Sequence, residues 1–153
     1  MEQAARVLVR RMTLADCDAL EPLAAELGSV DPRQELERDL TRAWVAHEPT
    51  TPLPLGYALG WWVVDELQLL AIGTLPAARR RGVGRALLEH VIQAAARAGG
   101  RRISLEVARN NSAAVQLYES AGFRVFNVRR NYYAKTRQDA LEMELELAEA
   151  TSD

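Results

Sequence analysis

A short segment rich in arginine and glycine, Arg79-Arg80-Arg81-Gly82-Val83-Gly84-Arg85, has the residue types of an anion-binding turn. Glycines let the backbone approach phosphate oxygens without interference from a Cβ atom, and arginines add charge-assisted hydrogen bonds. A helix that begins here would also offer unpaired N–H groups and the positive end of its dipole. The segment is not a dinucleotide fingerprint, because Leu87 stands where a small residue is needed, and it is not a P-loop. A tight turn with surface arginines is the alternative interpretation.

The charge distribution also points to this part of the chain. The net charge is −2, but residues 79–102 carry seven arginines against Glu89 alone. A local positive segment favours a small anionic ligand over a long nucleic-acid track, although a solvated helix face would give the same composition. The single cysteine, Cys17, excludes an internal disulfide and is expected to be a small buried residue. With only two histidines besides, we expect no metal site.

The length and composition favour one globular domain over residues 1–153, and residues 148–153 are expected to form a flexible tail. No apolar run reaches the roughly 20 residues of a membrane span. Residues 1–6 lack the apolar segment of a secretory signal, which predicts a cytoplasmic protein. We therefore expect neither a membrane nor a nucleic acid as a direct partner.

The candidate residues must be positioned by alternating strands and helices of an α/β chain. Strands are predicted from runs of β-prone or alternating residues, and helices from apolar residues at helical spacing. The strands are expected at 7–11, 43–47, 55–64, 67–74, 103–107, 123–130 and 140–147, and the helices at 13–27, 31–41, 81–98 and 112–121. The order is βααβββαβαββ. The run 67–74 is almost continuously apolar, which predicts burial on both faces.

Two motifs in this order resemble the GCN5-related N-acetyltransferases (GNAT). Arg79-x-x-Gly82-x-Gly84 is similar to their pyrophosphate-binding signature, and residues 111–123 are similar to their last helix and the strand after it. Residues 82–90, 105–107 and 129–133 resemble the RimI-type ribosomal-protein alanine N-acetyltransferases in particular. The resemblance implies a mixed central sheet of six to seven strands flanked by about four helices. The similarity is dense over 66–147.

The resemblance implies acetyl-CoA as co-substrate and assigns residues to it. Backbone groups of Ile72, Gly73 and Thr74 would pair with the pantetheine arm like an added strand, and an N–H near Gly73 or Thr74 would stabilise the oxyanion. The pyrophosphate would be held by Arg79, Arg80, Arg81, Gly82, Val83, Gly84 and Arg85. Asn111 would also contact the cofactor; it is equally suited to capping the helix that follows, and the two roles are compatible.

The resemblance also assigns the acid and base. Glu106 points away from the apolar residues of its strand and would take a proton from the amine, directly or through water. Tyr118 would protonate the departing thiolate. The alternatives are a solvated edge glutamate and a packed aromatic residue with a hydrogen-bonded hydroxyl.

The expected activity is acetyl transfer to a primary amine by direct attack, with a protein N-terminal α-amine, as in a ribosomal protein, as the preferred acceptor. A lysine side chain or a small amine is the first alternative, and a non-catalytic CoA-binding module is another. An arginine-rich nucleic-acid binder is disfavoured by the negative net charge. Two departures from the RimI-type pattern concern the acceptor side: residues 28–32 contain no aromatic residue, and Leu75 stands where an acidic residue is common.

Overall fold

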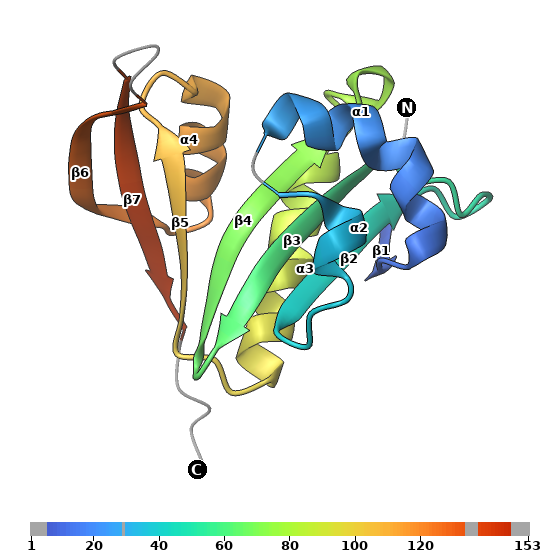
Figure 1. Ribbon diagram of the computed structural model, residues 1–153, viewed down its shortest axis with the longest axis horizontal. Coiled ribbons are helices and arrows are strands. Elements are labelled where there is room, and N and C mark those ends of the chain that lie inside the picture. Colours follow the sequence, from blue (N-terminus) through green and yellow to red (C-terminus); the bar gives the residue numbers. More distant parts are fainter. Residues whose placement is uncertain (1–5, 29, 134–137, 148–153) are drawn as a thin grey trace.

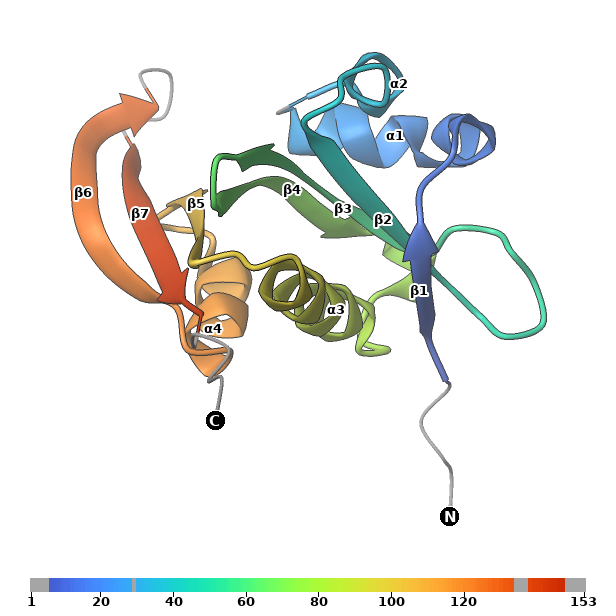
Figure 2. The same ribbon diagram turned by 90° about the horizontal axis from the view of Figure 1, so that it is seen from below.

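One mixed sheet organises the protein (Figures 1 and 2). The computed structural model describes residues 6–28, 30–133 and 138–147, so the predicted tail at 148–153 lies outside the described residues. The strands are β1 (Leu8–Arg11), β2 (Thr41–His47), β3 (Gly56–Val63), β4 (Glu66–Thr74), β5 (Arg102–Ala108), β6 (Arg124–Tyr133) and β7 (Gln138–Glu146). The helices are α1 (Cys17–Leu27), α2 (Pro32–Glu35), α3 (Val83–Arg97) and α4 (Ser112–Ser120). The predicted order βααβββαβαββ is confirmed.

The sheet runs in the order β1-β2-β3-β4-β5-β7-β6, and β4–β5 is its parallel pair. Figure 2 shows α1 and α2 on one face and α3 and α4 on the other. Each face has its own apolar core: Leu20 and Leu23 of α1 pack on Tyr57 of β3, whereas Leu87 and Val91 of α3 pack on the opposite face. The two cores fix both helical layers to the sheet.

The second helix is much shorter than predicted. The sequence favoured a helix over 31–41, but α2 ends at Glu35. Tertiary contacts of Glu35 and of the residues after it stabilise a different backbone path there. The Glu35 carboxylate accepts hydrogen bonds from Trp61 Nε1 at 2.6 Å and Thr41 Oγ1 at 3.2 Å. The Leu40 carbonyl accepts a bond from Trp62 N–H at 2.8 Å, so the chain has already joined the sheet where the helix was expected to continue.

A β-bulge in β4 opens the sheet. Leu69 lies opposite Gly60 and Ala71 lies opposite Leu59, so Leu70 is the extra residue. A bulge bends its strand, and the parallel pairing of β4 with β5 ends at Leu69. The strands diverge beyond this point, as Figure 1 shows. The predicted burial of β4 on both faces is therefore wrong: buried and half-buried residues alternate up to Ala71, and the last three residues are half-buried.

Candidate active site

A groove of about 930 Å³ lies where β4 and β5 diverge. Its lining comes from β4, β5, β6, β7, α4, the end of α1 and the start of α3. Seven of the thirteen predicted site residues line it: Ile72, Gly73, Thr74, Gly84, Glu106, Asn111 and Tyr118. The other six belong to the turn before α3 and to its first turn. The structure thus brings the candidate acid, the candidate base and the free edge of β4 into one groove.

The free edge of β4 exposes backbone groups of alternate residues. Leu75 N–H donates to the Leu55 carbonyl at 2.8 Å, and hydrogen-bonded pairs alternate along an antiparallel ladder. Gly73 therefore directs its backbone groups to β3, whereas Ile72 and Thr74 direct theirs toward the groove. In agreement, the Thr74 carbonyl accepts a bond from Arg79 Nε at 3.3 Å instead of pairing with β3.

Gly73 matters through its missing side chain. A Cβ atom at this position would lie 2.9 Å from Leu27 Cδ1 and 3.2 Å from Leu23 Cδ1, which is closer than ordinary van der Waals contact. The glycine thus allows α1 to pack closely on β4. This contact sets the position of the end of α1 beside the groove.

The N-terminus of α3 has the geometry of an anion site. Gly82 is its N-cap with φ 78°, and no side chain caps the helix. The first helical bond runs from Ala86 N–H to the Gly82 carbonyl at 3.0 Å, which leaves the N–H groups of residues 83–85 without a partner among the described residues. A Cβ atom on Gly82 would meet nothing within 4 Å, and one on Gly84 would come no closer than 3.6 Å to Leu117 Cδ2. Open space therefore adjoins both glycines, and Gly84 lines the groove.

The arginines of this turn are less free than the sequence suggested. Arg79 forms an ion pair with Glu26 at 3.1 Å, and Arg81 forms one with Glu48 at 2.8 Å. Arg85 donates to Ser120 Oγ at 3.0 Å. Arg80 is exposed and has a left-handed backbone, with φ 65°. Binding an anion through Arg79 or Arg81 would require these side chains to exchange a carboxylate for the ligand.

Asn111 caps α4, as the sequence predicted. Its Oδ1 accepts a hydrogen bond from Ala114 N–H at 3.3 Å, and the residue also lines the groove. Capping leaves the amide NH₂ group available as a donor toward a ligand.

Glu106 is a partly exposed carboxylate in a charged surrounding. It lies on β5 directly opposite Glu142 of β7, and its Oε1 is 3.4 Å from Nη1 of Arg129. Burial raises the pKa of Glu106, the positive charge of Arg129 opposes the rise, and the neighbouring carboxylate of Glu142 adds to it. The net effect is a raised pKa, which suits a general base that works near neutral pH.

Tyr118 lies in the wall of the groove with its ring 5.7 Å from that of Phe123. Its side chain is buried, and this burial raises its pKa to about 12. No hydrogen bond joins its hydroxyl to any residue that the structure describes. The phenol therefore stays protonated at neutral pH and can donate a proton into the groove.

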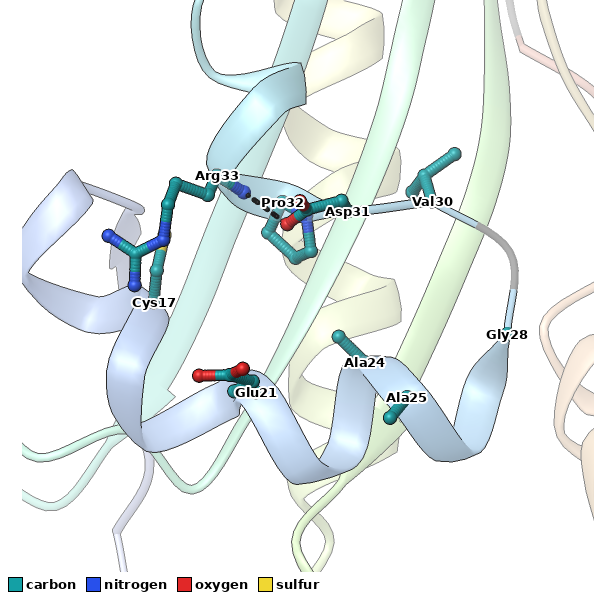
Figure 3. Close-up of a pocket in the computed structure, with 9 residues that line it drawn as sticks. All are labelled: Cys17, Glu21, Ala24, Ala25, Gly28, Val30, Asp31, Pro32 and Arg33. Carbon is teal, nitrogen blue, oxygen red and sulfur yellow. Dashed lines mark hydrogen bonds between the residues drawn. The ribbon is translucent and has the colours of Figure 1, made fainter.

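A second cavity, of about 410 Å³, lies between α1 and α2 (Figure 3). Its lining includes Ala24 and Ala25 of α1, and across from them Asp31, whose side chain accepts a bond from Arg33 N–H at 3.0 Å. Gly28 lines this cavity and the groove alike. This cavity was not predicted from the sequence; the two adjacent alanines on α1 are the local signal for the space.

Two charged residues beside Glu106 were also missed. Arg129 and Glu142 form an ion pair at 3.0 Å within the β6–β7 hairpin, and Glu142 lines the groove. A signal existed in the alternation of β7, where Glu142 falls on the face opposite Leu141 and Met143. Within the described part of the chain, no three potential ligands cluster as a metal site would require, and no helix is long and apolar enough to cross a bilayer.

Comparisons with known proteins agree with this geometry. Residues 12–123 match the model of the acetyltransferase (GNAT) family. The [ribosomal protein bS18]-alanine N-acetyltransferase of Escherichia coli K12 is 44% identical over 94 residues, covering 60% of this chain and 64% of that protein. The N-alpha-acetyltransferase RimI of Mycobacterium tuberculosis is 39% identical over 93 residues, covering 58% of this chain and 57% of that protein. These alignments thus span less than two thirds of either relative.

The crystal structure of the ribosomal-protein-S18-alanine N-acetyltransferase from Escherichia coli superposes with a TM-score of 0.82, at 28% identity, covering 97% of this chain and 98% of that one. The family match covers well over half of the chain and the folds agree throughout. The chain belongs to the acetyltransferase (GNAT) family.

Proposed function

We propose that this protein transfers the acetyl group of acetyl-CoA to a primary amine. The observation that carries the proposal is the single groove that holds Glu106, Tyr118 and the free edge of β4, and ends at the open N-terminus of α3. A base, an acid, a row of backbone groups and an anion site are the parts that this reaction needs. Membership of the GNAT family supports the same chemistry.

The chain's own groups fit the parts of acetyl-CoA, which would supply the acetyl thioester. The N–H groups at the start of α3 suit the pyrophosphate, and Arg80 and Arg85 lie close enough in the chain to add charge. The backbone groups of Ile72 and Thr74 suit the amides of the pantetheine arm. The backbone groups of Gly73 are directed to β3 and not toward the pantetheine arm. Gly73 contributes instead through its missing side chain, which lets α1 pack on β4.

Glu106 and Tyr118 divide the proton transfers. Glu106 takes a proton from the acceptor's ammonium group, so that the neutral amine attacks the thioester carbonyl, and Thr74 N–H stabilises the oxyanion. Tyr118 gives its proton to the departing thiolate, and the second proton that the amine nitrogen loses as the amide forms restores the phenol. Cys17 is the first residue of α1; its side chain is buried and lines the second cavity, not the groove. The chain's only thiol is thus remote from the reaction, which favours direct attack over an acetylated cysteine.

The preferred acceptor is a protein N-terminal α-amine, as in a ribosomal protein. The names of the Escherichia coli and Mycobacterium tuberculosis relatives support this choice. Exposed aromatic rings of Phe126 and Tyr132 line the groove near Glu106, where they can hold the first residues of a peptide. A cytoplasmic location is part of the same proposal.

A peptide panel tests the proposal. The protein is incubated with acetyl-CoA and with matched peptides that have a free or blocked N-terminus, each with and without a lysine, and also with a polyamine; products are read by mass spectrometry. Acetylation of every free N-terminus and of no blocked lysine-containing peptide is expected. Acetylation of lysine or of the polyamine alone would move the acceptor to the alternative class. Tight acetyl-CoA binding without any product would leave a CoA-binding module.

A further inference from the structure

One guanidinium group lies between two carboxylates at the acceptor end of the groove. Arg129 of β6 places Nη1 3.4 Å from Glu106 Oε1 and Nε 3.0 Å from Glu142 Oε1. The two glutamates face each other across β5 and β7. Without the arginine, two negative charges would lie side by side, which is unfavourable for directly opposed cross-strand residues.

The arginine is bound unequally to the two carboxylates. Glu142 has a second partner, since its Oε2 accepts a bond from Asn127 Nδ2 at 2.7 Å, and its side chain is only 16% exposed. Glu106 has the longer contact, and its side chain is 36% exposed. The Arg129 guanidinium also lies 5.0 Å from the centre of the Tyr132 ring. Arg129 is therefore held by Glu142 and Tyr132, and its hold on Glu106 is the contact most easily exchanged.

We propose that Arg129 is a positioning residue: it serves as the resident counter-ion of Glu106 and yields that place to the acceptor's ammonium group while it stays on Glu142. The inference rests on the proposed acetyl transfer and deepens it. The acceptor arrives as a cation, so it can replace the guanidinium at Glu106 without leaving a carboxylate unpaired. Glu142 keeps Arg129 within the site for the next cycle.

The proposal has a consequence for the ionisation of Glu106. Among the described residues, the titratable groups that contact Glu106 or line the groove with it are Arg129 and Tyr132 from β6, Glu142 from β7 and Tyr118 from α4. Burial raises the pKa of Glu106 and Glu142 adds to the rise, whereas Arg129 counteracts both. Removing Arg129 must therefore raise the pKa of Glu106 further. Because the base works ionised, the acidic limb of kcat/KM must move to higher pH.

The test compares three variants with the wild type. In Arg129→Met the acidic limb of kcat/KM for the acceptor is expected to lie about one pH unit higher. At a given pH on that limb, kcat/KM should therefore fall about tenfold, and at high pH it should fall less. The double variant Arg129→Met/Glu142→Gln removes the opposing charge as well, so its limb should return toward that of the wild type. The acidic limb of Arg129→Lys should lie between those of the wild type and Arg129→Met. A loss in Arg129→Met that is equal at every pH, with no recovery in the double variant, would overturn the proposal.

A direct titration separates this inference from the proposed function. The carboxyl ¹³C signal of Glu106, assigned with Glu106→Gln, is followed against pH. It gives the midpoint of the Glu106 titration and needs no turnover. A midpoint that rises in Arg129→Met and falls back in the double variant supports Arg129 as the counter-ion of Glu106 even if no amine is acetylated, while an unchanged midpoint overturns the proposal. Arg124→Met is the matched control, because Arg124 lies on the same strand and pairs with exposed Glu146 at 4.0 Å. It should leave the midpoint unchanged, and a matching shift in this control would also overturn the proposal.

Discussion

Asp16 and Glu106 each have an arginine partner, but the two pairs are built differently. Asp16 is buried between β1 and α1, where both nitrogens of the Arg10 fork donate to it at 2.9 and 2.7 Å and Thr13 N–H donates at 2.8 Å. Glu106 is one-third exposed and has a single contact of 3.4 Å with an arginine that it shares with Glu142. One carboxylate is enclosed by donors, and the other opens into a groove.

The difference reverses the direction of the pKa shift. At Asp16, burial alone would raise the pKa, but the hydrogen bonds from Arg10 and Thr13 outweigh burial and hold the pKa below its usual value. At Glu106, burial and Glu142 together outweigh Arg129 and raise the pKa. Donor number and geometry thus decide whether an Arg–carboxylate pair stabilises the fold or remains available for proton transfer.

Replacing the groove carboxylate should give the largest effect. Glu106→Gln is expected to lower kcat/KM about 10²–10³-fold near pH 7, because the amine loses its base, and to lower it less at high pH, where the amine is already neutral. The free energy of unfolding should hardly change. Steady-state rates across pH test this, with Glu144→Gln as control, since Glu144 lies on the same strand as Glu142 and pairs with Arg102. An equal loss at every pH would contradict the base role.

Replacing the enclosed carboxylate should affect stability instead. Asp16→Asn removes a buried charge that accepts four hydrogen bonds, so we expect a loss of about 2 kcal/mol in the free energy of unfolding and of roughly 4–8 °C in Tm. The rate per folded molecule should stay the same, because Asp16 does not line the groove. Calorimetry measures the loss of stability, and rates measured well below Tm give the activity per folded molecule. A fall in kcat without a fall in Tm would mean that the two carboxylates are not separate in function.

Acidification should separate the two carboxylates in the wild-type protein. The raised pKa of Glu106 means that activity falls with pH above the usual glutamate value of 4.5. Protonating Glu106 relieves a partly buried charge, so this step does not reduce stability. Asp16 has a depressed pKa, and its contribution is present above the usual 3.8 and lost as pH falls through the folded value. Circular dichroism and rates measured together should therefore find folded, inactive protein between the two transitions; simultaneous loss would contradict this order.

A tyrosine hydroxyl in the groove should have a smaller effect. Tyr118→Phe is expected to lower kcat about tenfold, because the thiolate then takes its proton from water, while Tm changes little. The pKa of about 12 also predicts no basic limb from Tyr118 below pH 9. Tyr57→Phe is a matched control: its hydroxyl is buried with no hydrogen-bond partner among the residues that the structure describes, and its pKa is likewise raised to about 12. This control should keep its activity; an equal loss in both variants would argue against an acid role for Tyr118.

The sequence predicted the features that local patterns determine. Strand alternation placed Glu106 opposite its apolar neighbours, and Asn111 marked the start of α4. The third helix was predicted from residue 81, whereas α3 begins at Val83 with Gly82 as its N-cap. The predicted end of α2 was wrong because Glu35 accepts a hydrogen bond from Trp61, which lies 26 residues away in the chain. The bulge at Leu70 depends on the register of β3 against β4.

The charges around Glu106 were missed for a similar reason. Glu106, Arg129 and Glu142 come from three strands, and only the strand order β5-β7-β6 brings them together. Arg10 and Asp16, by contrast, are six residues apart and meet through a single turn. Local spacing thus identifies candidate residues, whereas the partners that tune their pKa follow from the sheet register.

The two arginines should also differ when each becomes lysine. Arg10 binds Asp16 with both arms of its fork and reaches the Pro52 carbonyl at 2.9 Å. A lysine cannot reproduce that fork, so Arg10→Lys should lower the free energy of unfolding by about 1 kcal/mol. Arg129 is half-exposed and makes no such fork with Glu106, so Arg129→Lys should change stability by less than about 0.5 kcal/mol. Urea midpoints compare the two, and equal losses would mean that the enclosed and the open pair are energetically alike, against their geometry.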